Sequence, residues 1–383
     1  QEIQDLLKEK NTVIKKLDEV FSFLKGNYIF ITCYLISCYI QKMSKYINVA
    51  VVGATGYIGL ELIKLLIKHP KVKIKNICAQ RSIGESMYKF DSSLKKKSLP
   101  KITNLTSLNF NNIDLLFTAL PNGEAQKISK KLNPKVKLID LSADFRLESP
   151  KNYKKWYNIT HKSKNLIKHS IYSIPELIDV KLDKFRIISC PGCYPTSIQI
   201  PLVPIIKNKL INTKNIIIDS KSGYSGAGKN LHKKFKFKNI YESISAYGVS
   251  SHRHIAEIDQ QLNKISKNKI KVQFTPHLLP MFRGILSTIY VNLNKNISAK
   301  KIYECLKKYY KNKYFIKFAK FNTPIGTGDI IHTNFCKISV CNGRKKNKAI
   351  ILTAIDNLIK GGSGQAMQNM NLLCGFKEQM GFK

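Results

Sequence analysis

The residue types best suited to covalent chemistry meet in residues 189–197, Ser-Cys-Pro-Gly-Cys-Tyr-Pro-Thr-Ser. A short β-type run, residues 186–188, precedes this stretch, and an apolar run, residues 198–206, follows it and predicts a helix despite two prolines. A cysteine at a strand-to-helix turn lies near main-chain N–H groups and the positive end of the helix dipole, which favour thiolate over thiol. Cys193 is therefore the candidate nucleophile, and the alternative is a small buried apolar residue.

Cys190 and Cys193 also form a C-x-x-C pair, which would suit a redox couple or half of a zinc site. No second C-x-x-C follows to complete such a site, and the pair His252 and His254 has no H-E-x-x-H or third-ligand pattern beside it. No metal site is predicted. A histidine near a cysteine nucleophile is the usual acid–base partner, so both histidines are candidates for that role, against a purely structural one.

The charge of the chain invites a nucleic-acid interpretation, because 65 Lys and Arg residues against 24 Asp and Glu give a net charge of +41. Only six of the 65 are arginines, and the 59 lysines are spread over almost the whole length. Nucleic-acid modules rely on arginine, aromatic platforms and recognisable motifs, none of which is visible. The lysines therefore indicate solvated faces, and no nucleic-acid partner is expected.

The nine cysteines are odd in number and scattered, unlike those of a disulfide-stapled secreted scaffold. This pattern predicts free thiols in a reducing compartment, the cytoplasm. Residues 1–42 differ from the rest: apolar residues at helical spacing predict an amphipathic helix, and the apolar residues 28–40 are too few for a membrane span. Met43 stands directly before a strand pattern, so we expect the functional protein to start there and residues 1–42 to lie outside the fold.

A phosphate cradle is predicted where a β-branched run, residues 47–52, leads into Gly53-Ala54-Thr55-Gly56-Tyr57-Ile58-Gly59 and then into an amphipathic run. Strand, glycine turn and helix in this order let the main chain approach a pyrophosphate at the helix N-terminus, although the spacing is not the commoner G-x-G-x-x-G. The next strand, residues 72–79, ends in Gln80-Arg81-Ser82. No acidic residue stands there to hold the ribose hydroxyls of NAD, whereas Arg81 could bind the 2′-phosphate of NADP, so NADP is the predicted cofactor. The alternative is that Arg81 is simply an exposed loop arginine.

Strands and helices alternate further through residues 113–119, 124–132 and 136–140, and the last of these leads into Ser142-Ala143-Asp144-Phe145-Arg146. Loops at the carboxyl ends of parallel strands bind ligands in doubly wound folds, whereas the alternative for these polar residues is a turn with a surface ion pair. After Cys193, longer connections separate four β-type runs, which predict a second domain with a mixed sheet. These runs are residues 216–220, 271–274, 284–291 and 336–340. A glycine-rich loop, residues 221–229, is either a second phosphate cradle or a flexible turn.

Several separate motifs together resemble one family. In chain order they are GATGYIG, ALPNG, LSADFRL, YSIPEL, PGCYPT, SGYSGAGK, HRHIAEI, HLLPMFRGI and DNLIKGGSGQAMQNMN. From about Met43 to the C-terminus, the chain resembles the N-acetyl-γ-glutamyl-phosphate reductases of arginine biosynthesis, in the wider aspartate-semialdehyde dehydrogenase-like group. It departs from the family at Asn122, where a histidine is usual, and in residues 324–333.

The resemblance implies an α/β fold: a Rossmann-type doubly wound NADP-binding domain, residues 43–189 with 356–383, and an α+β substrate and dimerisation domain with a mixed sheet, residues 190–355. It implies NADPH-dependent reduction of an acyl phosphate to an aldehyde through a cysteine thioester, in a homo-oligomer without a membrane partner. Two alternatives stay open. One is a related phosphorylating dehydrogenase acting on aspartyl phosphate, and the other is a basic nucleic-acid-binding protein on an inactive enzyme scaffold.

The resemblance also implies a set of site residues. Cys193, His252 and His254 would be catalytic. Cofactor-binding residues would be Gly53, Thr55, Gly56, Tyr57, Ile58, Gly59, Arg81, Ser82, Pro121, Gly226 and Asn369, with Gly361 and Gly362 close to the cofactor. Substrate-binding residues would be Ser142, Arg146, Ser222, Gly223 and Arg283. Arg283 can offer a planar fork to a carboxylate, and its alternative is a structural ion pair.

Overall fold

The computed structural model describes residues 12–15, 46–229 and 242–382. By its contacts the chain divides into two compact units, Gln1–Tyr46 and Ile47–Lys383. In the first unit, residues 12–15 form a helical turn, and the rest of the predicted amphipathic helix and the apolar residues 28–40 lie outside the described residues. The second unit holds all the elements discussed below. No helix in the described part of the chain is both long enough and apolar enough to cross a membrane.

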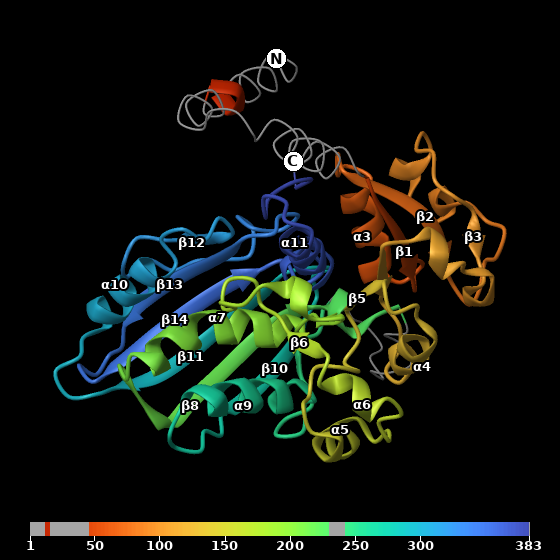
Figure 1. The fold of residues 1–383 in the computed structure, drawn as a ribbon. Helices are drawn as coiled ribbons and strands as arrows, with labels where there is room; N and C mark the ends of the chain where they lie inside the picture. The colour runs from red at the N-terminus through yellow and green to blue at the C-terminus, as the bar shows by residue number, and fades with distance from the viewer. Residues whose placement is uncertain (1–11, 16–45, 230–241, 383) are drawn as a thin grey trace, which may run out of the picture. The chain divides into compact units, whose positions relative to one another are not determined.

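The first sheet has the strand order β3-β2-β1-β4-β5-β7-β6, and every neighbouring pair is parallel (Figure 1). Its strands are β1 (Ile47–Val52), β2 (Val72–Cys78), β3 (Ile102–Thr103), β4 (Leu115–Thr118), β5 (Lys137–Asp140), β6 (Ser170–Tyr172) and β7 (Ile187–Ser189). Helix α3 (Tyr57–Leu66) packs on one face, and α4 (Glu124–Lys131) packs on the other. Because both faces are covered, the central strands are continuous apolar runs, and the predicted doubly wound sheet is confirmed.

The second sheet has the order β12-β13-β14-β11-β8-β10-β9 and mixes parallel with antiparallel pairs, as predicted. Its strands are β8 (Ile211–Gly223), β9 (Ser245–Ala246), β10 (Gln273–Leu279), β11 (Ile285–Leu293), β12 (Ile316–Phe318), β13 (Cys336–Asn342) and β14 (Lys348–Ile355). The helices α7 (Cys193–Lys207), α9 (His254–Ile265) and α10 (Ala299–Tyr309) bury one face of this sheet in a shared core. The four predicted β-type runs became β8, β10, β11 and β13, whereas β14 was not foreseen.

Helix α7 starts at Cys193 and contains Pro201 and Pro204, as the apolar run predicted. A proline inside a helix leaves the carbonyl four residues earlier without its N–H partner. Here the Thr353 hydroxyl donates to Ser197 O at 2.8 Å, and the Tyr310 hydroxyl donates to Ile200 O at 2.5 Å. Side chains of β14 and α10 thus replace the two missing main-chain bonds, which lets this buried helix stay continuous.

After β14 the chain returns to the first sheet. The π-helix η7 (Ile359–Ser363) leads into α11 (Gly364–Leu373), and Figure 1 shows α11 beside α3. Side chains of α11, Met367 and Met370 among them, join the core that α3 forms with the first sheet. Other helices in the described residues are α5 (Pro150–Tyr157) and α6 (Lys164–Ile167), with short 3₁₀ turns between some of the strands. The domain boundaries at residues 190 and 356 stay a prediction.

Candidate active site

A cleft of about 1130 Å³ opens where the carboxyl ends of the first-sheet strands meet the N-terminus of α7. Most of the predicted site residues line it. They are Gly53, Thr55, Gly56, Tyr57, Ile58, Gly59, Arg81, Pro121, Ser142, Arg146, Cys193, Ser222, Gly226, His252 and His254, together with Gly361 and Gly362. The fold therefore gathers segments that are more than 300 residues apart along the chain around one cavity. Ser82, Gly223, Arg283 and Asn369 do not line it.

The two cysteines of the C-x-x-C pair have different environments. Cys190 is buried, and its Sγ lies 3.7 Å from Asn369 Nδ2. Cys193 is partly exposed, lines the cleft and is the first residue of α7. Both residues border the cleft, but Cys193 is the more exposed of the two and is therefore the better placed to meet a substrate. Among the described residues, no three His, Cys, Asp or Glu side chains come together in a way that could hold a metal.

The sequence predicted that the helix N-terminus favours the thiolate of Cys193, whereas the environment in the structure favours the thiol. Burial raises the pKa of the Cys193 thiol to about 11, although the main-chain N–H of Tyr194 and the charge of Arg146 act in the opposite direction. The helix N-terminus does favour thiolate, as predicted, but the loss of solvent outweighs it. The protein alone therefore holds Cys193 as a thiol, and a base must take its proton before it can attack.

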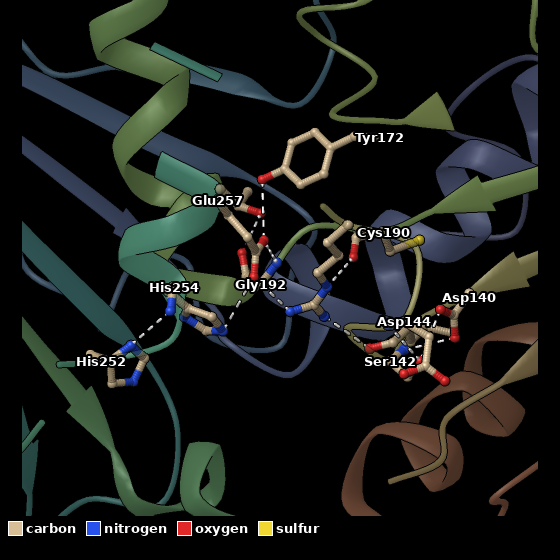
Figure 2. Close-up of polar contacts among 12 residues, drawn as sticks. Asp140, Ser142, Asp144, Tyr172, Cys190, Gly192, His252, His254 and Glu257 are labelled. Atoms are coloured by element: carbon tan, nitrogen blue, oxygen red, sulfur yellow. Dashed lines mark hydrogen bonds and ion pairs between the residues drawn. The ribbon is translucent and has the colours of Figure 1, made fainter. Parts of the chain in front are cut away.

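Both histidines line the same cleft as this thiol. A Cβ atom built on Gly192 would come within 2.3 Å of His254 Nε2, so the imidazole of His254 packs directly against the residue that precedes Cys193. The His252 ring lies 4.8 Å from that of His254, and its Nδ1 accepts a 3.2 Å hydrogen bond from the His254 N–H (Figure 2). Burial lowers the pKa of His252 to about 4 and that of His254 well below its ordinary value. Both are neutral near pH 7 and are able to accept a proton.

A buried glutamate, Glu257, links these groups, and the sequence analysis did not name it. Figure 2 shows its carboxylate between Tyr172, Gly192 and His254. Glu257 Oε2 accepts the Gly192 N–H at 2.9 Å and the Tyr172 hydroxyl at 3.3 Å, and Oε1 pairs with Arg146 Nη1 at 3.0 Å. Its position three residues after His254, on the same helix face, was the available signal.

The polar side chains of the loop after β5 form hydrogen bonds with other groups of the protein. Arg146 Nε donates to Cys190 O at 2.8 Å, and its Nη2 donates to Leu141 O at 2.9 Å. Ser142 Oγ donates to Asp140 Oδ2 at 2.8 Å, and burial, followed by the charge of Asp144, raises the pKa of Asp140 to about 6. The turn of the alternative is therefore present, but the ion pair that Arg146 forms with Glu257 is buried and not on the surface. Substrate contact by Ser142 and Arg146 stays a prediction.

The glycine turn fits a dinucleotide pyrophosphate. Gly53 has a φ of +85°, and a Cβ there would meet Ala119 O at 2.2 Å, while a Cβ on Gly59 would meet Gly53 O at 2.3 Å. In the described part of the chain, no side chain caps the α3 N-terminus that follows, so its first N–H groups are available to an anion. Arg81 is exposed at the same end of the cleft. Lys229 adds a second cation there, with its Nζ 5.5 Å from the ring centroid of Tyr57.

Two predicted ligand residues have other partners. Arg283 pairs with Asp356 Oδ2 at 3.1 Å and with Glu61 Oε1 at 3.0 Å, so in this structure two carboxylates of the protein occupy its fork, and the binding of a substrate carboxylate stays a prediction. Asn369 is buried and accepts the Ser173 hydroxyl at 2.5 Å, so it points into the protein and not toward a cofactor. The structural ion pair, the alternative for Arg283, is what the fold uses.

Two further predicted residues lie outside the cleft. Gly223 packs against the turn between β10 and β11, since a Cβ there would meet Phe282 O at 2.7 Å. Ser82 has a φ of +64° in the loop after β2. The glycine-rich loop is therefore split: Ser222 and Gly226 face the cleft, and Gly223 supports the sheet edge.

Comparison with known proteins defines the class. Residues 48–185 match the model of the semialdehyde dehydrogenase NAD binding domain, and residues 193–357 match that of the semialdehyde dehydrogenase dimerisation domain. Among solved structures, aspartate semialdehyde dehydrogenase II from Vibrio cholerae shares the fold, with a TM-score of 0.64 and 18% identity over 86% of this chain and 98% of that one. The enzyme from Candida albicans, solved with NADP, gives a TM-score of 0.61 and 17% identity over 86% and 98%. The chain is an oxidoreductase of the semialdehyde dehydrogenase class.

Sequence relatives narrow the class to a family. N-acetyl-gamma-glutamyl-phosphate reductase from Ehrlichia ruminantium is 44% identical over 86% of this chain and 96% of its own length. The probable chloroplastic N-acetyl-gamma-glutamyl-phosphate reductase of Arabidopsis thaliana is 41% identical over 89% and 85%. The chain belongs to the N-acetyl-γ-glutamyl-phosphate reductase family, which confirms the resemblance of its motifs.

Proposed function

We propose that this protein reduces N-acetyl-γ-glutamyl phosphate to N-acetylglutamate semialdehyde and phosphate, a step of arginine biosynthesis, with NADPH as reductant. The observation that carries the proposal is that Cys193, His254 and the glycine turn that starts at Gly53 line one cleft. A nucleophile, a base and a pyrophosphate cradle around one cavity meet the needs of an acyl-phosphate reductase. The identity of the acyl group, N-acetyl-γ-glutamyl, rests on the names of the relatives.

The chain's own residues carry the acyl transfer. Cys193 gives its proton to the neutral imidazole of His254, and the thiolate attacks the acyl carbon. The carbon–oxygen bond to phosphate breaks, the imidazolium of His254 gives its proton to the departing phosphate, and a thioester on Cys193 remains. NADPH, when bound, supplies the hydride that reduces the thioester carbon. Collapse of the resulting thiohemiacetal releases the aldehyde and the Cys193 thiolate, which solvent reprotonates.

The same cleft would hold the cofactor. The N–H groups at the start of α3 would take the pyrophosphate, and Arg81 would take the 2′-phosphate that distinguishes NADP from NAD. Ser142, Arg146 and Ser222 remain the candidates for substrate contact at the Cys193 end of the cleft. The cleft's lysine and arginine side chains, Lys229 and Arg81 among them, would attract anionic ligands.

The test is the reverse reaction. N-acetylglutamate semialdehyde, phosphate and NADP should generate NADPH absorbance with the wild-type protein, and aspartate semialdehyde should compete poorly. Preference for aspartate semialdehyde would make the protein an aspartyl-phosphate reductase instead. Absence of turnover with either aldehyde would reject both enzyme assignments.

We also propose that copies of the chain associate through the open face of the second sheet. Ile218, Ile289 and Ile351 point into the core, while their neighbours Ile217 and Tyr290 on the opposite face are 48% and 41% exposed. Apolar side chains on a sheet face suit burial by a second copy, and the matching model is that of a dimerisation domain.

The described cysteines are unbridged, which supports the predicted reducing compartment, the cytoplasm.

A further inference from the structure

We propose that Glu257 is a positioning residue: its carboxylate fixes the Gly192–Cys193 turn against His254 and supplies the negative charge that faces the imidazole while it carries the proton from Cys193. This inference rests on the function proposed above. Its geometric basis is that one fully buried carboxylate lies close to both the turn before Cys193 and the imidazole of His254. Glu257 Oε2 holds the Gly192 N–H at 2.9 Å, and Oε1 lies 3.9 Å from His254 Nε2.

The first role is mechanical. The Gly192 N–H bond fixes the main chain directly before Cys193, and Arg146 extends the support because it joins Glu257 to Cys190 O. Glu257 itself is fixed by the start of α9, which also carries His254. Nucleophile and base are therefore positioned by the same side chain, so their separation does not depend on a flexible loop.

The second role is electrostatic. Apart from burial, the described groups that act on His254 are His252, Arg146 and Arg253, and all three oppose a proton on its imidazole. Glu257 is the neighbouring carboxylate within ion-pair distance of His254, with its Oε1 3.9 Å from Nε2. When the imidazole takes the Cys193 proton, an attraction to Glu257 replaces part of the lost hydration. The thiol also responds to this carboxylate, because its negative charge opposes thiolate formation.

These two effects give Glu257 a signature that a merely structural ion pair lacks. Glu257→Gln removes the charge but keeps the size of the side chain. Cys193 should then ionise at lower pH, while His254 becomes a poorer proton acceptor. More thiolate and slower turnover in one variant is an unusual combination, since loss of packing alone would not move the thiol titration in that direction.

The chain offers a matched control. Glu176 is also fully buried and pairs with a cation, Lys360, at 2.6 Å, yet its described partners are Lys360 and Gln368, away from Gly192 and His254. Glu176→Gln therefore reproduces the loss of a buried carboxylate without touching Cys193 or His254. Glu257→Asp keeps the charge and serves as the conservative variant if Glu257→Gln folds poorly.

Two measurements test the inference. The first is kcat and KM in the reverse reaction; we expect kcat to fall about 100-fold in Glu257→Gln, the range of one acid–base contribution, with KM for NADP changed little, and to fall less in Glu257→Asp. The second is the pH dependence of iodoacetamide labelling at Cys193, followed on the peptide that contains it. Its midpoint should move to lower pH in Glu257→Gln and stay unchanged in Glu176→Gln.

The inference is overturned if Glu257→Gln leaves the labelling midpoint unchanged, or if its kcat falls no further than that of Glu176→Gln. A wild-type protein that is inactive with N-acetylglutamate semialdehyde would reject the proposed function. The labelling experiment would still decide the role of Glu257, because it needs neither substrate nor cofactor.

Discussion

The main chain of Gly361 packs directly on Cys193: a Cβ atom at Gly361 would lie 2.6 Å from the Cβ of Cys193. The π-helix η7 therefore closes one side of the candidate nucleophile, and its residues Gly361 and Gly362 both border the cleft. This contact explains how a thiol at an open cleft is still surrounded by protein atoms, and why burial dominates its ionisation.

The first prediction separates the two cysteines. Cys193→Ser should abolish turnover, because a serine hydroxyl at this position has a far higher pKa than a thiol, while NADPH binding measured by fluorescence should persist. Cys190→Ala should keep most of the activity, since the Cys190 side chain is buried and its Sγ contacts Asn369 inside the protein. Loss of turnover in Cys190→Ala with retention in Cys193→Ser would reverse the assignment.

The second prediction concerns the choice of cofactor. Arg81→Ala should raise KM for NADPH about 10-fold or more and change KM for NADH little, because a charge-assisted hydrogen bond to phosphate is worth roughly 1.5–3 kcal/mol. Arg344→Ala, at another exposed arginine, is the control. Equal increases for both cofactors would show that Arg81 does not contact the 2′-phosphate.

The third prediction follows from the two ion pairs of Arg283. Because Arg283 bridges Glu61 of α3 and Asp356 after β14, Arg283→Ala should lower the free energy of unfolding by roughly 3 kcal/mol through the buried Asp356 left unpaired. Urea denaturation measures this loss, and Arg344→Ala should show almost none. An intact stability combined with a large rise in KM for the aldehyde would favour the substrate-binding role.

The fourth prediction is a pH dependence of stability. Burial, with a smaller effect of Arg253, lowers the pKa of His252 from 6.5 to about 4, so between these values the unfolded chain binds a proton that the folded protein refuses. Stability due to this group is therefore fully present above about pH 6.5 and is lost as the pH falls toward about 4. Denaturation at about pH 7 and about pH 4.5 should show a smaller acid loss in His252→Gln, by on the order of 2 kcal/mol. An identical loss in both proteins would contradict it.

The sequence was sufficient for local features. The glycine turn after residues 47–52 and the helix start at Cys193 depend on residue types within a few positions, because glycine tolerates a positive φ and close approach of the main chain, whereas proline fixes φ. The motifs in their order then identified the family. Strand β14 was missed because its apolar residues, 349–355, run on without a clear period and suit a strand or a buried helix equally.

The contacts that the sequence analysis did not predict join residues far apart in the chain. Glu257 meets Arg146 across 111 positions, and Arg283 meets Glu61 across 222 positions. Nothing in the local pattern around Arg283 distinguishes a fork that awaits a carboxylate ligand from one that already holds two carboxylates of the protein. Such assignments require the fold, because burial and pairing are decided by packing between elements far apart in the chain.

The position of α11 determines when, during translation, the core around the first sheet can be completed. Met367 and Met370 complete the core that α3 forms with the first sheet, and Gly361 completes the wall beside Cys193. During translation the nucleotide-binding half leaves the ribosome first, but its own core is filled only after residues 361–370 have been made. A nascent chain that stops before these residues would therefore expose an apolar groove along α3 and lack the wall that Gly361 forms beside Cys193.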